Sequence, residues 1–379
     1  FTVYNSIIFE VSMIRERNPV FDNLRAICML GVIAIHLGAS VIDSATPSEH
    51  IFMLFEILSR YSVPTFFFIS GYGLFYSYSL EKPLDYFHFL KRRLITIGLP
   101  YVIVSLLYIF YSDMIQPDPH NWELSSIIFK LSFGTAFYHI YFLVILIWFY
   151  ICFPIWRYLM RFMEFCSLKY SLPVLALLQL HLYHASDHFW SYPQWIAAQD
   201  WLYNLCEYRL NYFPLFYLFV FMLGGVIARH YGLFKIFLAK YPLPITLAFL
   251  ASASTNAFLF YRYTYKWGMD WEFSANTFQQ LSTPGFIYTI TAIFFFSMVI
   301  DRFPELSHKL LSRFSDRSFL IYLFHPFIID ALANKLQYHA GLPFNKVPMI
   351  PFYIAVLLIS FALAELLHPV LHKIKNTFN

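Results

Sequence analysis

Charged residues are scarce in this 379-residue sequence: Asp, Glu, Lys and Arg make up 13% of it, whereas a soluble domain carries about 25%. The four cysteines share no CxxC spacing, which excludes a recognisable disulfide framework or cysteine zinc site. A Gly-rich phosphate loop, a G-x-S-x-G elbow and an adjacent cysteine–histidine nucleophile are also absent from the sequence. These absences argue against a soluble enzyme of the common nucleotide-binding and hydrolase classes.

Hydrophobic side chains dominate instead, at 59% of the residues, with 22% aromatic residues and a mean hydropathy of +0.57. A chain of this composition must hide most of its surface from water, so we expect a polytopic protein of the lipid bilayer. The formal net charge is only +4, and no nucleic-acid partner is indicated.

Long apolar runs predict an all-α membrane protein with about ten transmembrane helices, because about 20 apolar residues cross a bilayer. We expect a single transmembrane domain over residues 21–372, a cytoplasmic segment 1–20, a cytoplasmic tail 373–379 and a short interfacial helix at 121–133. The ten runs cover residues 22–42, 51–79, 93–112, 138–156, 171–189, 211–229, 242–262, 284–300, 318–336 and 348–370.

Basic residues are distributed unequally between the two sets of loops, and such an excess marks the cytoplasmic side. One set holds nineteen of the 26 Lys and Arg residues, which predicts ten spans with both termini in the cytoplasm, in the plasma or inner membrane. That set is Arg15, Arg17, Arg25, Lys82, Lys91, Arg92, Arg93, Arg157, Arg161, Lys169, Arg229, Lys235, Lys240, Arg302, Lys309, Arg313, Arg317, Lys373 and Lys375.

The opposite loops are rich in tryptophan and carboxylates. Such rings stack on sugar faces while carboxylates accept hydroxyl hydrogen bonds, so the pattern favours a sugar ligand; an interfacial aromatic belt is the alternative. The residues are Trp122, Trp190, Trp195, Trp201, Trp267 and Trp271, with Asp187, Asp200, Glu207, Asp270 and Glu272.

The first apolar run contains Arg25 and His36, eleven residues apart. At about 100° per residue the two side chains share one helix face, and they are separated by about 16 Å along the axis. Ionisable residues inside a membrane are costly and indicate function. His36 is therefore a candidate general base, because histidine titrates near neutral pH; a packed histidine bonded to a neighbouring helix is the alternative.

Further candidates lie in later runs. Arg60 is predicted at the depth of His36, either as an oxyanion clamp or as a salt-bridge partner of Glu56 one turn away. Lys91, Arg92 and Arg93 form a cluster at the cytoplasmic mouth of the third run, which predicts either a phosphate site or membrane anchoring.

Histidines in two later segments are further candidates. His325 lies two turns into the ninth run, one turn after Tyr322, and Asp330 or Glu365 is a candidate to orient a histidine. His181, His184 and His188 share a helix face at the outer interface; they suit a polar helix end or a glycan contact better than a metal, because no H-E-x-x-H pattern is present. We expect no metal site.

Five features together resemble the integral-membrane acyltransferase family 3. They are the Arg25–His36 pair, "VPTFFFISGY" (63–72), "KRRLITIGLPY" (91–101), "YHIYFL" (138–143) and "IYLFHP" (321–326), in this order along the chain.

The resemblance implies a helical membrane enzyme that takes acetyl or another acyl group from cytoplasmic acyl-CoA. Members O-acylate cell-surface polysaccharides, peptidoglycan, teichoic acids, lipids and antibiotics, and their first-helix arginine and histidine correspond to Arg25 and His36. The basic R-x-x-R pattern of the family is only half present, because Thr96 follows Arg93 at the second position. Many members carry an SGNH-type domain after the spans; this sequence shows none, so we expect transfer directly to the acceptor or to a separate partner.

The expected mechanism binds acyl-CoA, as a substrate and not a resident cofactor, at Arg25 and the Lys91–Arg93 cluster. His36 then deprotonates a hydroxyl of a cell-surface glycan or lipid-linked sugar, and Arg60 with Tyr72 stabilises the oxyanion. An acyl-histidine intermediate is a variant. The alternative functions are a transporter or flippase for a lipid-linked sugar, although no inverted repeat is visible, and an envelope sensor or scaffold.

Overall fold

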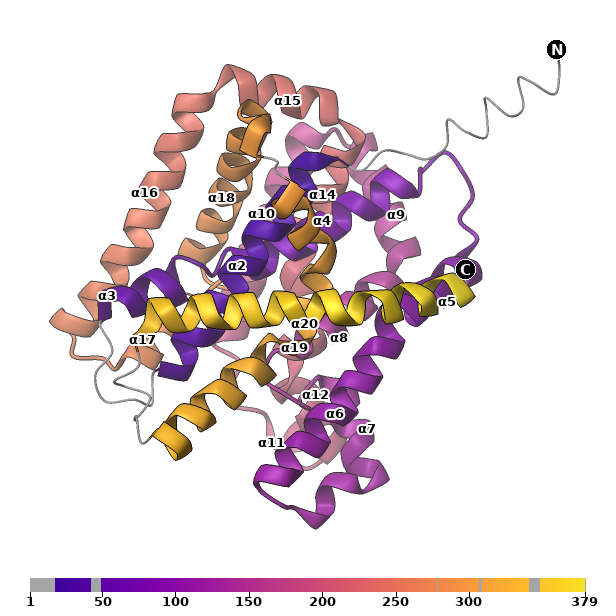
Figure 1. Ribbon diagram of the computed structural model, residues 1–379. Helices are drawn as coiled ribbons and strands as arrows, with labels where there is room; N and C mark the ends of the chain where they lie inside the picture. The colour runs from indigo at the N-terminus through magenta and orange to yellow at the C-terminus, as the bar shows by residue number, and fades with distance from the viewer. Residues whose placement is uncertain (1–17, 42–48, 278, 307–308, 341–347, 379) are drawn as a thin grey trace.

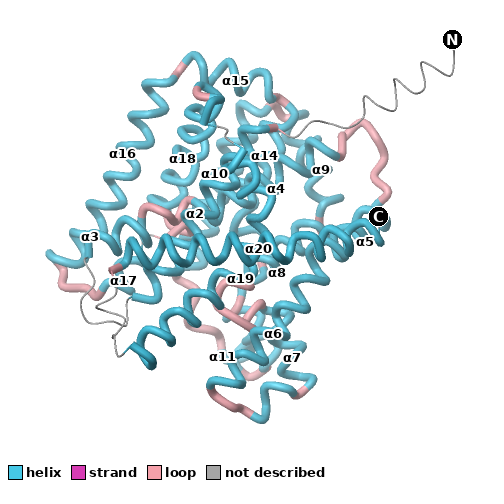
Figure 2. Tube along the Cα trace, viewed as in Figure 1, coloured by secondary structure: helices cyan, strands magenta, loops and turns pink. Residues whose placement is uncertain are grey.

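The computed structural model describes residues 18–41, 49–277, 279–306, 309–340 and 348–378. Within these ranges every regular element is a helix, and Figure 2 shows no strand among them. The all-α prediction is confirmed for this part of the chain. Its physical basis is that a helix satisfies its backbone hydrogen bonds internally, as an apolar environment requires.

Ten helices, together with the short elements that continue them, account for most of the chain (Figure 1). They are α2 (Pro19–Val41), α4 (Ser62–Ser77), α6 (Leu99–Ile115), α8 (Tyr141–Ile151), α10 (Leu168–Asp187), α14 (Leu218–Arg229), α16 (Pro242–Tyr261), α18 (Thr283–Arg302), α19 (Lys309–Ala340) and α20 (Met349–Phe378).

The remaining helices extend or connect these ten. They are α3 (Glu49–Phe52), α5 (Tyr86–Arg93), α7 (Leu124–Phe133), α9 (Phe153–Phe165), α11 (Gln194–Ala197), α12 (Asp200–Glu207), α13 (Arg209–Tyr212), α15 (Tyr231–Lys240) and α17 (Trp271–Thr277). Three π-helical turns, η1 (Met53–Ile57), η2 (Leu94–Gly98) and η5 (Arg262–Lys266), and three 3₁₀ turns, η3 (Pro119–Trp122), η4 (Pro214–Tyr217) and η6 (Pro304–Leu306), complete the described elements. The helix α7 lies where the short helix at 121–133 is predicted.

Six continuous helices among the described residues are long and apolar enough to cross a membrane, and eight segments qualify when two bent pairs are included. The bends are 66° between α8 and α9 and 98° between η4–α14 and α15. The second predicted run is interrupted by η1 and a turn before α4, which leaves α4 with only 16 residues. The membrane-protein class is supported, while the count of ten spans stays a prediction.

Segments that the charge pattern assigns to one side contact one another. Arg229 at the end of α14 pairs with Glu164 of α9 (2.5 Å) and with Glu81 in the loop after α4 (3.1 Å). Arg157 of α9 donates a hydrogen bond to the carbonyl oxygen of Lys82 (2.6 Å). These bonds join three basic segments. Arg15 and Arg17, which belong to the same set of basic residues, lie outside the described residues.

The segments assigned to the other side also pair with one another. His50 of α3 and the Tyr261 hydroxyl at the end of α16 are hydrogen-bonded (2.7 Å), and the Arg209 guanidinium lies 4.1 Å from the centre of the Trp190 ring. Figure 1 shows α7, α11 and α12 at the bottom of the view, opposite α9 and α15 at the top. The two sets of loops therefore occupy two ends of the bundle; which end faces the cytoplasm remains a prediction.

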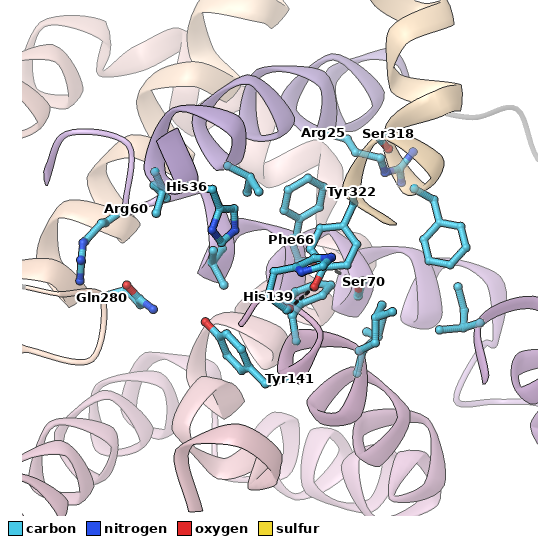
Figure 3. A pocket seen from close by; sticks show the side chains of 18 of the residues that line it. Arg25, His36, Arg60, Phe66, Ser70, His139, Tyr141, Gln280, Ser318 and Tyr322 are labelled. Carbon is cyan, nitrogen blue, oxygen red and sulfur yellow. Dashed lines mark hydrogen bonds between the residues drawn. The ribbon is translucent and has the colours of Figure 1, made fainter. Parts of the chain in front are cut away.

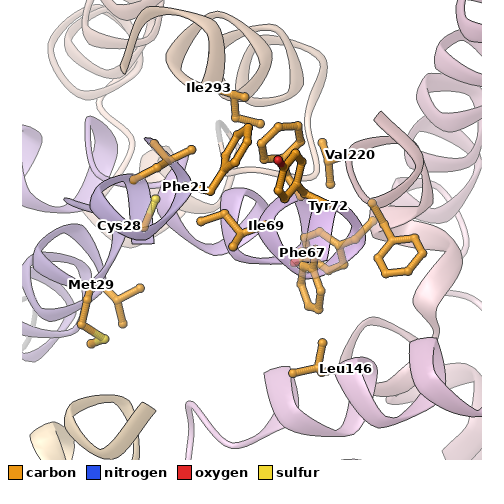
Figure 4. Close-up of a cluster of buried hydrophobic side chains, with 14 of the residues drawn as sticks. Phe21, Cys28, Met29, Phe67, Ile69, Tyr72, Leu146, Val220 and Ile293 are labelled. Carbon is orange, nitrogen blue, oxygen red and sulfur yellow. The ribbon is translucent and has the colours of Figure 1, made fainter. Parts of the chain in front are cut away.

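The core is built by α2, α4 and α14, which pack at close range. A Cβ atom added to Gly71 of α4 would lie 2.0 Å from the carbonyl oxygen of Phe221, and one added to Gly224 of α14 would lie 2.1 Å from that of Phe68. Only glycine permits backbones to approach so closely. Figure 4 shows the apolar side chains around this contact, including Phe67 and Val220.

Candidate active site

A cavity of about 420 Å³ contains Arg25, His36 and Arg60, three of the predicted site residues. Its volume falls within the range of small-molecule sites, about 300–1,000 Å³. The remaining lining residues are Val32, Ile35, Val63, Phe66, Ser70, Ile97, His139, Tyr141, Phe142, Leu143, Leu146, Tyr150, Gln279, Gln280, Ser318, Phe319 and Tyr322.

The three residues are spread along the cavity. Figure 3 shows Arg25 and Ser318 on one side of His36, and Arg60 and Gln280 on the other. Arg25 and His36 both come from α2 and both line the cavity, as their eleven-residue spacing predicts. The cavity is thus elongated, with a histidine between two arginines.

Three imidazole rings gather at this point. The centroid of the His36 ring lies 5.1 Å from that of His325 and 6.1 Å from that of His139, and the latter two are 5.7 Å apart. Tyr138 packs against His36 at 4.9 Å. The rings come from α2, α19 and the segment before α8, so only the tertiary structure brings them together.

The protonation of His325 can be inferred from its bonds. Its Nδ1 lies 3.0 Å from the carbonyl oxygens of both Ile321 and Tyr322. Carbonyl oxygens accept hydrogen bonds only, so Nδ1 carries the proton and the neutral ring keeps its lone pair on Nε2. That Nε2 is buried and has no hydrogen-bond partner among the described residues. In its neutral form His325 therefore presents an acceptor nitrogen whose ring packs beside that of His36.

His139 is a site residue that the sequence reasoning missed, although it belongs to the "YHIYFL" motif. It is 1% exposed and lies in the non-helical stretch 134–140 between α7 and α8. Gly134 ends α7 with φ of +65°, and a Cβ there would lie 2.4 Å from the Cα of Tyr141. The Tyr322 hydroxyl donates to the His139 carbonyl oxygen. Irregular backbone at such depth is tolerated only where protein or a cavity surrounds it.

Arg60 forms the salt bridge with Glu56 that its four-residue spacing allows. The two side chains are only 11% and 3% exposed. Glu56 sits in the π-turn η1, an irregularity frequent at functional sites. Neither Arg60 Nε nor Glu56 Oε2 has a hydrogen-bond partner among the described residues. The salt-bridge reading is confirmed, and the pair retains hydrogen-bonding capacity.

The basic cluster at 91–93 is divided by the structure. Lys91 and Arg92 are exposed and do not line the cavity. Arg93 is half-buried, and its guanidinium lies 5.4 Å from the ring centre of Tyr150, a residue that lines the cavity with Arg25. Arg25 itself is bonded to Asp22 at 2.9 Å. Arg93 is thus the member of the cluster closest to the Arg25 end.

Tyr72 is placed away from the cavity. Its hydroxyl accepts a hydrogen bond from Asn18 Nδ2 (3.1 Å), and its ring packs against Phe21 with 3.9 Å between centroids. It is not among the lining residues, whereas Tyr141 is. The reason is geometric: two residues beyond Ser70, a helical side chain points to a different face.

Two other hypotheses from the sequence, on Glu365 and on the outer histidines, can be compared with the structure. Glu365 forms salt bridges with Arg313 (2.8 Å) and Arg317 (3.3 Å) between α20 and α19. His184 and His188 pack against each other at 4.4 Å. Among the described residues, no group of three or more His, Cys, Asp or Glu side chains is arranged to hold a metal ion.

The fold and the site together define a class: a helical membrane protein whose cavity holds a histidine between two arginines. The chain matches the family model described as an acyltransferase domain, acyltransferase family 3, over residues 18–368, and it belongs to that family. It is therefore a membrane acyltransferase. The chain matches no curated protein and no solved structure.

Proposed function

We propose that this protein transfers an acyl group, most simply acetyl, from cytoplasmic acyl-CoA to a hydroxyl of an extracytoplasmic cell-envelope polysaccharide or glycolipid. One observation carries the proposal: in a chain of acyltransferase family 3, Arg25, His36 and Arg60 line the same elongated cavity. Such a passage lets a donor and an acceptor meet at His36 from opposite ends.

The donor enters at the Arg25 end in this scheme. Arg25 and Arg93 bind the phosphates of acyl-CoA, since guanidinium groups pair well with phosphate oxygens. The exposed Lys91 and Arg92 attract the anion to this mouth. The pantetheine arm then extends between Tyr150 and Ser318 toward His36, and acyl-CoA is a substrate, with no resident cofactor required.

The chemistry is acyl transfer with His36 as general base. His36 takes the proton of the acceptor hydroxyl, and the hydroxyl oxygen attacks the thioester carbonyl. Arg60 Nε, which has no partner among the described residues, donates to the resulting oxyanion. Collapse breaks the carbon–sulfur bond, and the coenzyme A thiolate recovers the proton from His36.

Neighbouring residues complete this scheme. The Nε2 atom of His325, which has no hydrogen-bond partner among the described residues, accepts a hydrogen bond from His36 and so orients its ring. Tyr141, which lines the cavity, replaces Tyr72 as the second oxyanion donor. An acyl-His36 intermediate is the covalent variant of the same reaction.

Replacement of His36 by alanine tests the proposal. General base catalysis contributes about 10²–10⁴-fold, so His36→Ala should lower transfer of labelled acetyl from acetyl-CoA to envelope polysaccharide by about that factor. His120→Ala, an exposed histidine that does not line the cavity, is the matched control and should retain full activity at equal abundance. Full transfer by His36→Ala would show that the base is another group.

The flippase alternative makes a different prediction. A flippase has no use for acetyl-CoA, so acetyl-CoA should neither protect it from heat nor be turned over. Saturable stabilisation of the purified protein by acetyl-CoA, together with release of free coenzyme A thiol, favours the transferase. A sensor or scaffold would show no turnover.

A further inference from the structure

The end of the cavity opposite Arg25 is built from a different kind of polar group. Arg60, Gln279, Gln280 and Tyr141 line it, and Figure 3 shows Arg60 and Gln280 together on one side of His36. Arg60 is bonded to the buried Glu56, so the pair carries no net charge. This end therefore offers hydrogen bonds without the net positive charge that a phosphate would require.

The amide group of glutamine can both donate a hydrogen bond to a hydroxyl and accept one from it. It has two N–H donors and one carbonyl acceptor, and a sugar hydroxyl both donates and accepts. Gln280 Nε2 donates a long bond of 3.5 Å to the Tyr217 hydroxyl. That bond uses one N–H, and within the described part of the chain the Gln280 amide makes no other hydrogen bond. Two adjacent amides in a cavity wall suit a ligand with several neutral hydroxyls.

The segment that carries the two glutamines is held rigidly. The Gln279 carbonyl oxygen accepts hydrogen bonds from the backbone N–H and the hydroxyl of Ser282 (3.0 and 2.7 Å). A Cβ on Gly285 would lie 2.2 Å from the same oxygen, so only glycine lets α18 begin this close to the segment. Ser282 also caps α18 by accepting from the Gly285 N–H (3.2 Å). Because this backbone is fixed, only the side chains of the two glutamines remain to be ordered when a ligand binds.

We propose that Gln279 and Gln280 form the acceptor subsite, in which they bind hydroxyls of a sugar ring next to the hydroxyl that His36 deprotonates. They thereby determine which hydroxyl is acylated. The inference rests on the proposed acyl transfer and deepens it, because it assigns the neutral polyhydroxyl substrate to one end of the cavity and acyl-CoA to the other.

The experiment measures the two substrates separately. Enzyme in membrane vesicles receives labelled acetyl-CoA and, as the acceptor probe, envelope polysaccharide of the producing cells deacylated by mild alkali. Gln279→Ala and Gln280→Ala should each raise the KM for the polysaccharide about five- to tenfold, the effect of one lost hydrogen bond. The KM for acetyl-CoA should stay unchanged, and the acetyl group should spread over more hydroxyl positions in NMR spectra of the product.

Two further variants separate hydrogen bonding from packing. Gln280→Met keeps the length of the side chain and removes its hydrogen bonds, so it should behave like Gln280→Ala. Gln194→Ala, an exposed outer-loop glutamine that does not line the cavity, should match the wild type. An unchanged donor KM in each variant shows that the protein is folded.

The outcomes distinguish this inference from the proposed function. If the wild type transfers acetyl to the polysaccharide and the Gln279 and Gln280 variants show an unaltered acceptor KM, the acceptor subsite is overturned and the transferase stands. A raised donor KM, or full recovery in Gln280→Met, also overturns the subsite. If the wild type transfers nothing to the polysaccharide, the proposed function fails and the subsite fails with it.

Discussion

Arg25 shows how a single residue acquires a role from its position. It lies on α2 at one end of the cavity, bonded to Asp22 and near Tyr150, over which Arg93 stacks. The side chain of Arg25 is 32% exposed, so its charge is not committed wholly to the protein. Two guanidinium groups at one mouth suit a ligand with several phosphates.

Replacing Arg25 should therefore weaken donor binding selectively. A charge-assisted hydrogen bond contributes about 1.5–3 kcal/mol, so Arg25→Gln should raise the KM for acetyl-CoA about 10- to 100-fold and leave the acceptor KM unchanged. Lys169→Gln, an exposed basic residue at the start of α10, is the matched control. A normal donor KM in Arg25→Gln would remove Arg25 from the phosphate site.

At the scale of the element, the interruptions of the helices contribute more to the candidate site than the regular helical parts do. The π-turn η1 contains Glu56, and η2 begins directly after Arg93. The non-helical stretch 134–140 delivers His139 to the other imidazoles. The irregular stretch 134–140 thus places His139 at the cavity wall, and η1 places Glu56 beside Arg60, which lines the cavity.

The contact between α4 and α14 offers a sharp test of helix packing. Gly71→Ala should destabilise the protein, because its Cβ would lie 2.0 Å from the Phe221 carbonyl oxygen and the two helices must separate. Gly73→Ala, two residues later on α4, meets nothing within 4 Å and should be neutral or slightly stabilising. Thermal unfolding in detergent measures the difference; equal melting temperatures would contradict the close packing.

The two ends of the bundle give the whole molecule its direction. The proposed donor mouth lies at the end rich in Lys and Arg, and the glutamine pair belongs to the loop between α17 and α18, on the other side by the charge pattern. The proposed transfer of an acyl group across a membrane needs this polarity, since the proposed donor and acceptor lie on opposite sides.

Cysteine labelling can establish the orientation. In a background with the four native cysteines replaced by alanine, Trp195→Cys should react with a membrane-impermeant maleimide on intact cells. Lys169→Cys should react only after permeabilisation. Both positions are exposed, so accessibility within the protein does not limit either reaction. The reverse labelling pattern would invert the topology and the direction of transfer.

The sequence by itself determined the helical membrane class and the shared face of Arg25 and His36, and it offered the Glu56–Arg60 pair as one of two alternatives for Arg60. These features follow from composition and from the 3.6-residue period, which act within one segment. The number of spans was harder to predict, because π-turns and bends divide apolar runs without changing their composition.

Only the tertiary structure decided which residues share the cavity. Tyr72 was expected there and packs against Phe21 instead, while His139, Tyr141, Gln279 and Gln280 were not expected and line it. Their positions depend on irregular backbone at 134–140 and before α18, and on contacts between helices far apart in the chain. Periodicity carries no information about such segments, because their conformation is fixed by the helices packed around them.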